Sequence, residues 1–282
     1  MESMNKAQSR SHEQKYRLLL LDIDGTLRPQ KCTRIPEENV EEVRRIRSLG
    51  VQTAIATGRG RNSVPDAMLN GLSPDFWICA AGAQILTQDG KELFASRMSQ
   101  TCMEALLCFA DQRDFPLGFS FDDGLYFYRG FSYIEARNRT FGIPSTDRDC
   151  PNRDRHRKGM PFSAVAFPTQ EDIQFFTSKH RDLGLRFAYF NVQTDDGRVG
   201  CDILRPDQDK ANALDFLCRY LHIPTASAAA AGDGFNDIGM LKAAGLSYAM
   251  NHSLPEVKKA ADRIPSPQGY EIANMCREIW PV

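Results

Sequence analysis

An α/β fold is predicted for this chain: a three-layer, Rossmann-like core built on a parallel sheet and interrupted by an inserted α+β domain. Three observations carry the prediction. Apolar strands alternate with amphipathic helices at the start, hairpin patterns fill the middle, and the alternation returns at the end. We expect the core at residues 15–83 and 206–282, the insert at 84–205, and a disordered tail at 1–14.

The first part of the chain has the pattern of a parallel α/β sheet. Leu18–Leu21 is apolar throughout, as expected of a strand that is buried on both faces. Between Pro36 and Gly50, which suit the start and the end of a helix, apolar residues recur at helical spacing. Two further strands are expected, at 51–57 and 76–80.

Hairpin signals replace this pattern after Gly82. The turns Asp89-Gly90 and Asp123-Gly124 each lie between apolar runs, which is typical of antiparallel pairs. Alternation of helices and strands returns near Pro206, and the run Ala228–Ala231 is expected to be a strand from its context.

Composition argues against several classes of function. The net charge of -1 provides no general attraction for nucleic acid or anionic membrane, and Arg153, Arg155 and Arg157 are expected in a solvated loop. No apolar run approaches the roughly 20 residues of a membrane helix. Eight cysteines without a CxxC pair indicate reduced, buried thiols. We therefore expect a cytoplasmic protein with no nucleic-acid or membrane partner; the oligomeric state is not predicted.

Asp22 and Asp24 follow the first strand directly. Ligands of open α/β sheets bind at the carboxyl ends of the strands, and residues two apart in an extended chain point the same way. One carboxylate can then act as a nucleophile and the other as a general acid. Two anions beside a phosphate also require a cation, and oxygen ligands suit Mg²⁺. By itself, this pair is equally compatible with a polar turn after a buried strand.

A second polar cluster follows the alanine run. Asp233, Asn236 and Asp237 share one face of an expected helix start, and Gly232 and Gly234 permit a tight turn there. A simple helix cap would explain one of these side chains but not all three.

Two weaker signals complete the set. Thr57-Gly58-Arg59 ends a strand, where a hydroxyl and backbone N–H groups can hold phosphate oxygens. Lys210 precedes a helix and could neutralise phosphate, although a lone lysine there is ordinarily a surface residue.

Together these residues resemble the haloacid dehalogenase superfamily, in its Cof-type subgroup of sugar-phosphate phosphatases with a type II cap. The resemblance covers about residues 16–282, and Ala81-Gly82-Ala83 departs from the Asn-Gly-Ala that relatives often have. The matching motifs are Asp22-Ile23-Asp24-Gly25-Thr26-Leu27, Thr57-Gly58-Arg59, Lys210 and Gly232-Asp233-Gly234-Phe235-Asn236-Asp237.

The resemblance implies a role for each matched residue. Asp22 would be the nucleophile, and Asp24 the general acid and base, whose backbone carbonyl also binds Mg²⁺. Lys210 would stabilise the phosphoaspartate, and Thr57, with Gly58 and Arg59, would bind the phosphoryl group. Asp22, Asp24 and Asp233 would hold the metal ion, while Asn236 and Asp237 would support the phosphate, the metal waters or Lys210.

The expected function is a Mg²⁺-dependent phosphatase for small phosphorylated metabolites, in particular sugar phosphates. A phosphomannomutase-like phosphotransferase and a non-catalytic phospho-ligand binding protein stay open as alternatives. Gly82 is the expected hinge of the insert, and Asp202 is a candidate substrate contact or a solvated strand residue.

Overall fold

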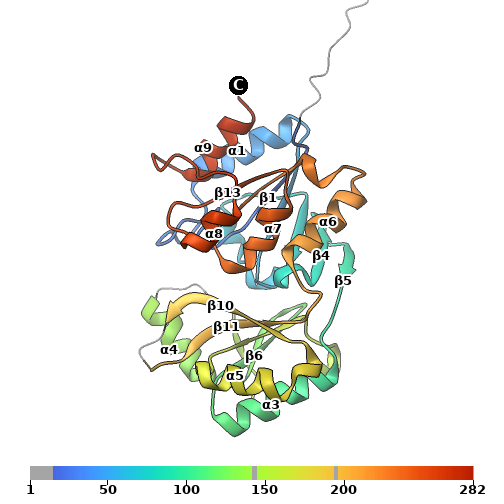
Figure 1. Cartoon of the computed structure of the whole chain (residues 1–282), viewed down its shortest axis with the longest axis vertical. Coiled ribbons are helices and arrows are strands. Elements are labelled where there is room, and N and C mark those ends of the chain that lie inside the picture. The colour runs from blue at the N-terminus through green and yellow to red at the C-terminus, as the bar shows by residue number, and fades with distance from the viewer. Residues whose placement is uncertain (1–14, 142–144, 194–195, 282) are drawn as a thin grey trace, which may run out of the picture.

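A seven-stranded sheet with the order β13-β12-β1-β2-β3-β4-β5 forms the larger of two layered units in this computed structural model (Figure 1). The structure describes residues 15–141, 145–193 and 196–281, so the tail expected at 1–14 lies outside the described residues. The first five strands in that order pair in parallel, and β4 and β5 pair antiparallel at one edge. The strands are β1 (Leu18–Leu21), β2 (Gln52–Ala56), β3 (Phe76–Cys79), β4 (Gln84–Thr87), β5 (Glu92–Ala95), β12 (Ala228–Gly232) and β13 (Leu246–Ala249).

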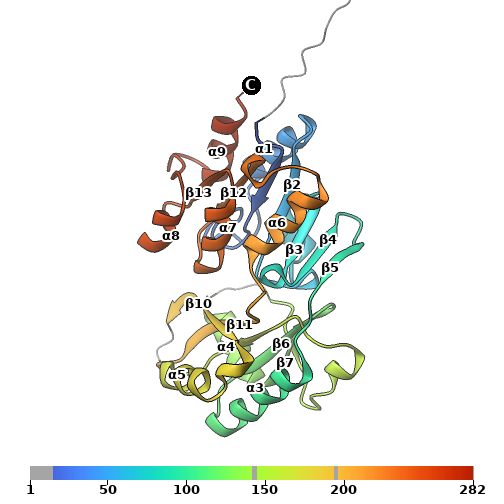
Figure 2. The same cartoon turned by 45° about the vertical axis from the view of Figure 1, so that its right-hand side comes forward.

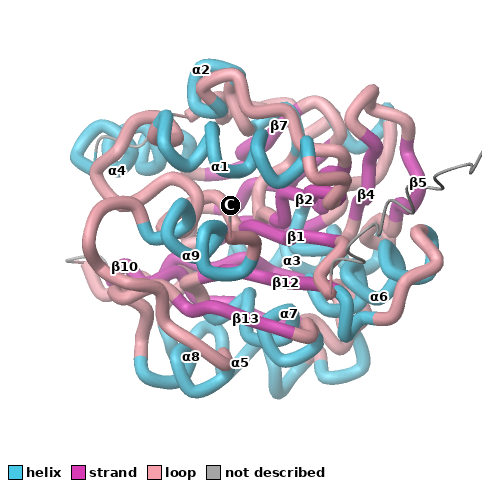
Figure 3. Tube along the Cα trace, turned by 90° about the horizontal axis from the view of Figure 1, so that it is seen from above, coloured by secondary structure: helices cyan, strands magenta, loops and turns pink. Residues whose placement is uncertain are grey.

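Helices cover both faces of this sheet (Figure 3). In β1, Leu19 and Leu21 pack in one cluster with residues of α1 and α9, while Leu18 and Leu20 pack in another with residues of α6 and α7. This alternation confirms the three-layer core and explains why β1 is apolar throughout. The helices are α1 (Glu37–Ser48), α2 (Asp66–Leu69), α6 (Lys210–Tyr220), α7 (Ile238–Ala243), α8 (Pro255–Ala260) and α9 (Glu271–Ile279).

A six-stranded sheet with the order β10-β11-β9-β6-β7-β8 forms the smaller unit, which we call the cap. Its pairs are antiparallel except for β7 with β8. Its strands are β6 (Leu117–Phe121), β7 (Gly124–Arg129), β8 (Arg148–Asp149), β9 (Ser163–Ala166), β10 (Arg186–Gln193) and β11 (Val199–Leu204). Its helices are α3 (Gln100–Arg113), α4 (Phe131–Phe141) and α5 (Gln170–Lys179). The predicted α+β insert is therefore present, including the capping box of Thr169 and Asp172.

One face of the cap sheet is covered by α3 and α5, on the side away from the core (Figure 1). In β11, Cys201 and Ile203 pack into this helical layer. Since side chains alternate along a strand, Asp202 between them points to the opposite face, toward the core.

The hairpin at 84–95 differs from its prediction. The sequence predicts that it belongs to the insert, but β4 pairs with β3, and buried Ile85 packs with β1 and α6, so the hairpin extends the core sheet. The chain therefore passes to the cap after Ala95 rather than at Gly82, and Gly82 packs against the backbone of Asp209 instead of lying at the crossing. The other predicted boundaries between the core and the insert stay a prediction.

The cap rests directly on the core (Figure 2). At the β6–β7 turn, Asp122 accepts hydrogen bonds from three side chains: Asn62 to its carbonyl at 2.5 Å, and Gln84 and Arg97 to its carboxylate at 3.2 and 3.0 Å. On the core side, a Cβ on Gly60 would lie 3.2 Å from Ser120 Oγ and 3.4 Å from the Phe121 carbonyl, so the two units approach closely at this glycine.

Several other sequence expectations can be compared with the structure. Arg155 is not solvated, because it packs over the rings of Phe121 and Tyr126 and pairs with Asp123.

All eight cysteine thiols are free, but only five are buried and Cys108 is exposed. Within the described ranges, no helix has the length and apolar character needed to cross a membrane.

Candidate active site

The carboxyl ends of three neighbouring parallel strands place the candidate residues together. Asp22 follows β1, Thr57 follows β2, and Asp233 follows β12, while the β1 register is Leu21 opposite Ala231 and Ile55. Parallel strands end at the same edge of a sheet, so the three side chains lie together at the edge that faces the cap (Figure 1). All three are buried.

Lys210 occupies the centre of this edge. Asp209 caps the N-terminus of α6 by accepting from the Ala211 N–H, and this places Lys210 in the first turn with its side chain fully buried. Its ammonium group donates to Asp22 Oδ1 at 2.7 Å and to Asp237 Oδ1 at 2.6 Å. Burial opposes the charge of the lysine, but the two carboxylates raise the pKa of Lys210 above its usual value. The lysine is thus an internal cation and not the surface residue that its position alone suggests.

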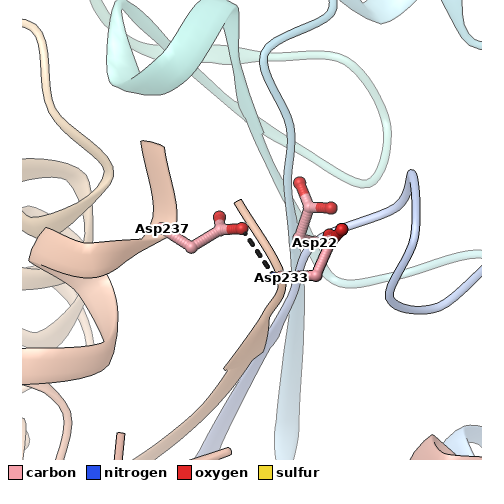
Figure 4. Close-up of side chains that lie close together, drawn as sticks. All are labelled: Asp22, Asp233 and Asp237. Carbon is pink, nitrogen blue, oxygen red and sulfur yellow. Dashed lines mark hydrogen bonds between the residues drawn. The ribbon is translucent and has the colours of Figure 1, made fainter. Parts of the chain in front are cut away.

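Asp22, Asp233 and Asp237 form a compact group of carboxylates. One oxygen from each lies within 4.8 Å of the others, and Figure 4 shows the three side chains grouped at the strand ends. Burial raises the pKa of Asp22 well above its usual value, and the neighbouring charges of Asp237 and Asp233 raise it further, against the effect of Lys210. Three buried carboxylates around one ammonium leave an excess of negative charge. An all-oxygen donor set with this excess fits a Mg²⁺ ion.

Asp237 also fixes the loop that carries Asp233. Its Oδ2 accepts the backbone N–H groups of Asp233 at 3.0 Å and Gly234 at 2.9 Å, and the first of these bonds is dashed in Figure 4. A Cβ on Gly232 would lie 2.5 Å from the Asp237 side chain, so this approach requires glycine. Asp237 therefore holds both Lys210 and the Asp233 loop, while its supporting role in a reaction stays a prediction.

Asp24 does not join the carboxylate group, which corrects the expectation that the side chains of Asp22, Asp24 and Asp233 converge. Its carboxylate accepts from Arg59 Nε at 2.6 Å and from Arg59 Nη2 at 3.1 Å, and it also pairs with Arg28. Burial alone would raise the pKa of Asp24, but the two guanidinium groups overcome it and lower the pKa to about 2. These two charges explain why the side chain turns away. The predicted metal contact through the Asp24 backbone carbonyl stays a prediction.

The loop after β2 presents a hydroxyl and a backbone N–H. Thr57 Oγ1 accepts the Arg59 N–H at 3.1 Å, which leaves the hydroxyl proton available for another acceptor. Among the described residues, no acceptor pairs with the Gly58 N–H. Thr57 and Gly58 therefore offer two donors for a phosphoryl oxygen, whereas the N–H and the guanidinium of Arg59 are engaged within the chain.

Asp202 of the cap and Asn236 of the core both approach Gly58. A Cβ on Gly58 would lie 3.1 Å from Asp202 Oδ2 and 3.7 Å from Asn236 Nδ2. Burial raises the pKa of Asp202 to about 7, against the opposing effects of Lys210 and Arg59. A carboxylate of the cap and an amide of the core thus both lie close to Gly58.

Comparison with known proteins gives the same family as the motifs. A family model described as haloacid dehalogenase-like hydrolase matches residues 19–267. The chain belongs to the haloacid dehalogenase-like hydrolase family. Phosphatase YwpJ from Bacillus subtilis is 22% identical over 299 residues, covering 93% of this chain and 99% of that protein. The chloroplastic endoribonuclease YBEY of Arabidopsis thaliana is 23% identical over 269 residues, but the chain spans only 45% of its length.

A solved structure of the same superfamily has the same fold. The subclass IIB sugar phosphatase BT4131 superimposes with a TM-score of 0.79 and 20% identity, covering 93% of this chain and 97% of that one. The Rossmann-like core with its inserted cap is thereby confirmed, and the family model makes the chain a haloacid dehalogenase-like hydrolase.

Two contacts of this hydrolase were not predicted from its sequence. Arg28, which pairs with Asp24, lies four residues after it. His252 contacts Asp233 through Nε2 at 3.0 Å, and this hydrogen bond raises the pKa of His252. The sequence pattern could have indicated the contact of His252. This residue follows β13, which pairs in parallel with β12, so it is expected at the same edge of the sheet as Asp233.

Proposed function

We propose that this hydrolase is a Mg²⁺-dependent phosphatase that cleaves small phosphomonoesters, in particular sugar phosphates, through an aspartyl-phosphate on Asp22. The observation that carries the proposal is the buried Lys210, which holds Asp22 and Asp237 beside Asp233. Phosphoryl transfer depends mainly on positioning and on neutralising charge, and this arrangement provides both.

Each side chain has a distinct task in the proposed reaction. Asp22 attacks phosphorus and forms an acyl phosphate as the bond to the leaving oxygen breaks. Lys210, Thr57 and the Gly58 N–H stabilise the negative charge on the phosphoryl oxygens. A Mg²⁺ ion held by Asp22 and Asp233, with Asp237 beside them, would neutralise the remaining charge when bound.

Asp24 supports the two proton transfers. The side chain would give a proton to the leaving oxygen and then accept one from the water that attacks the phosphorus of the acyl phosphate, releasing Asp22 and inorganic phosphate. The ionised carboxylate of the free protein, paired with Arg28 and Arg59, is ready for the second step. The first step requires Asp24 to take up a proton once the substrate is bound.

The surroundings of the proposed phosphate-binding loop support this substrate class. The cap contacts the core at Asp122 and Gly60, so the leaving group is enclosed between two units. Asp202 and Asn236 offer a carboxylate and an amide, which suit the hydroxyl groups of a small sugar. The name of the sugar phosphatase BT4131 supports the same class. A folded phosphoprotein would not fit under the cap.

The test is a phosphate-release assay of the full chain on sugar phosphates, nucleotides, pyridoxal phosphate and a phosphoprotein, with Mg²⁺ and with EDTA. We expect release of inorganic phosphate from at least one hexose or pentose phosphate, loss of activity in EDTA, and much slower release from the phosphoprotein. Isomerisation of a sugar phosphate without release would instead indicate a phosphomutase. Tight Mg²⁺-dependent binding without turnover would indicate a binding protein. Asp22→Asn is the control that should be inactive but folded.

A further inference from the structure

The carboxylate of Asp233 is held at both of its oxygen atoms. Thr26 Oγ1 donates to Oδ1 at 3.0 Å, and His252 Nε2 lies 3.0 Å from Oδ2. An ionised carboxylate can only accept, so this ring nitrogen carries the hydrogen. Gly25, at φ +94°, closes a third side, because a Cβ there would lie 2.2 Å from Oδ2. These contacts leave the carboxylate little freedom to turn about its Cβ–Cγ bond.

The backbone around His252 is itself fixed. The preceding residue, Asn251, donates from its N–H to Glu271 at the start of α9 at 2.9 Å and from its amide to the Pro265 carbonyl at 2.8 Å. Met250 N–H bonds to the Gly232 carbonyl at 3.3 Å, which joins the loop to the end of β12. The imidazole therefore lies on a loop anchored at two points, and it can hold Asp233 rather than follow it.

We propose that His252 is a positioning residue that fixes Asp233 for coordination through one oxygen and thereby makes the site prefer Mg²⁺ over Ca²⁺. The proposal rests on the metal site of the proposed function. Mg²⁺ requires near-octahedral geometry, whereas Ca²⁺ takes six to eight oxygens and often binds both oxygens of a carboxylate. Two-oxygen binding requires the carboxylate to turn toward the ion, and the donors on Oδ1 and Oδ2 oppose this turn.

Removing the imidazole should therefore affect the two ions unequally. Without His252, Asp233 keeps the Thr26 hydrogen bond and the close approach of Gly25, but no donor holds Oδ2, so the carboxylate gains freedom to turn. Mg²⁺ loses a preset ligand, and loss of such an outer contact typically lowers metal affinity by about 10–100-fold. Ca²⁺ loses the same preset ligand but gains access to two-oxygen binding. The ratio of the Ca²⁺ to the Mg²⁺ dissociation constant should fall.

The experiment is calorimetric titration of the full-length protein with MgCl₂ and with CaCl₂, without substrate. The variants are His252→Ala and His252→Phe, which remove the donor, and His252→Gln, which retains an N–H donor. The matched control is His222→Asn. His222 is exposed after α6 with φ 54°, a conformation that asparagine tolerates.

We expect both donor-free variants to bind Mg²⁺ at least about tenfold more weakly, with a much smaller change for Ca²⁺. His252→Gln should recover most of the selectivity, and His222→Asn should match the native protein. Equal losses for the two ions, or unchanged dissociation constants, would overturn the positioning role. A native protein that binds no Mg²⁺ would instead contradict the proposed function itself. His252→Phe keeps a planar ring in the loop, so the comparison does not depend on the folding of the alanine variant.

Discussion

Lys210 donates a hydrogen bond to Asp22 at 2.7 Å from an ammonium group that is completely buried, across 188 positions of the sequence. The contact joins the first turn of α6 to the end of β1, so it connects two elements of the core as well as two proposed catalytic groups. The same ammonium also holds Asp237. Its removal should therefore affect both stability and turnover.

Lys210→Met is expected to lower the free energy of unfolding by about 3 kcal/mol or more, because it leaves buried carboxylates without their cation. It should also lower kcat by about 10²–10³-fold, the typical cost of losing one charge-stabilising donor. Urea denaturation and steady-state kinetics measure the two effects. Lys242→Met, at an exposed position of α7, is the matched control and should change neither. Native-like turnover in Lys210→Met would exclude the proposed role of the lysine.

Asp24→Asn separates the acid role from the base role of this side chain. We expect kcat on alkyl phosphates to fall by about 10²–10⁴-fold, and by clearly less on aryl phosphates, whose leaving group needs little protonation. The comparison uses initial rates on a sugar phosphate and on p-nitrophenyl phosphate. Because Asp24 pairs with both Arg28 and Arg59 in the native protein, the fold of this variant must be checked by circular dichroism. Equal losses on both substrates would argue against general acid catalysis by Asp24.

Much of this site could be predicted because the rule that places it is local. Asp22, Thr57 and Asp233 each follow an apolar run, and the carboxyl ends of parallel strands meet at one edge. The prediction that the hairpin at 84–95 belongs to the insert is wrong, because a DG turn specifies pairing of its own two strands and not the sheet that they join.

The orientation of Asp24 required more than a local rule. Its carboxylate turns toward Arg28 and Arg59, and the second of these lies on another strand end. The burial of Lys210 likewise depends on two carboxylates distant in sequence, and its position before a helix is equally typical of a surface lysine. A pattern of strands and helices does not predict which charged residues far apart in the sequence will pair.

Gly58→Ala tests the close approach of the cap to the phosphate-binding loop. The new Cβ would lie 3.1 Å from Asp202 Oδ2, so the Asp202 side chain must shift by a few tenths of an ångström. We expect kcat/KM to fall about tenfold, with a change in unfolding free energy below about 1 kcal/mol.

A double-mutant cycle assigns the cause of that loss. If the Cβ acts through Asp202, the effect of Gly58→Ala on kcat/KM should be smaller when Asp202 is already alanine. Additive losses in the double variant would show that Gly58 acts independently of the cap, for example through its N–H.

Asp202→Asn should stabilise the protein at neutral and alkaline pH. The pKa of Asp202 is about 7 in the folded chain, where burial disfavours its charge, and an unfolded aspartate has a pKa of about 3.9. Below about pH 4 both states are protonated, so native protein and variant should differ little. Between about pH 4 and pH 7 only the unfolded state is ionised, and the native protein loses stability as the pH rises.

Above about pH 7 the cost of ionising the buried Asp202 is fully present and constant. A shift of three pKa units corresponds to about 4 kcal/mol, and relaxation of the cap against the core should reduce this to about 2 kcal/mol. The attraction of Lys210 and Arg59 for the ionised carboxylate is already part of that pKa. Urea denaturation of native protein and Asp202→Asn at pH 5, 6, 7 and 8 gives the difference directly. The difference in unfolding free energy should grow from pH 5 to pH 7 and then level off. A difference that is constant over this range would mean that Asp202 is ionised at little cost where the cap meets Gly58. A variant less stable than the native protein at pH 8 would mean the same.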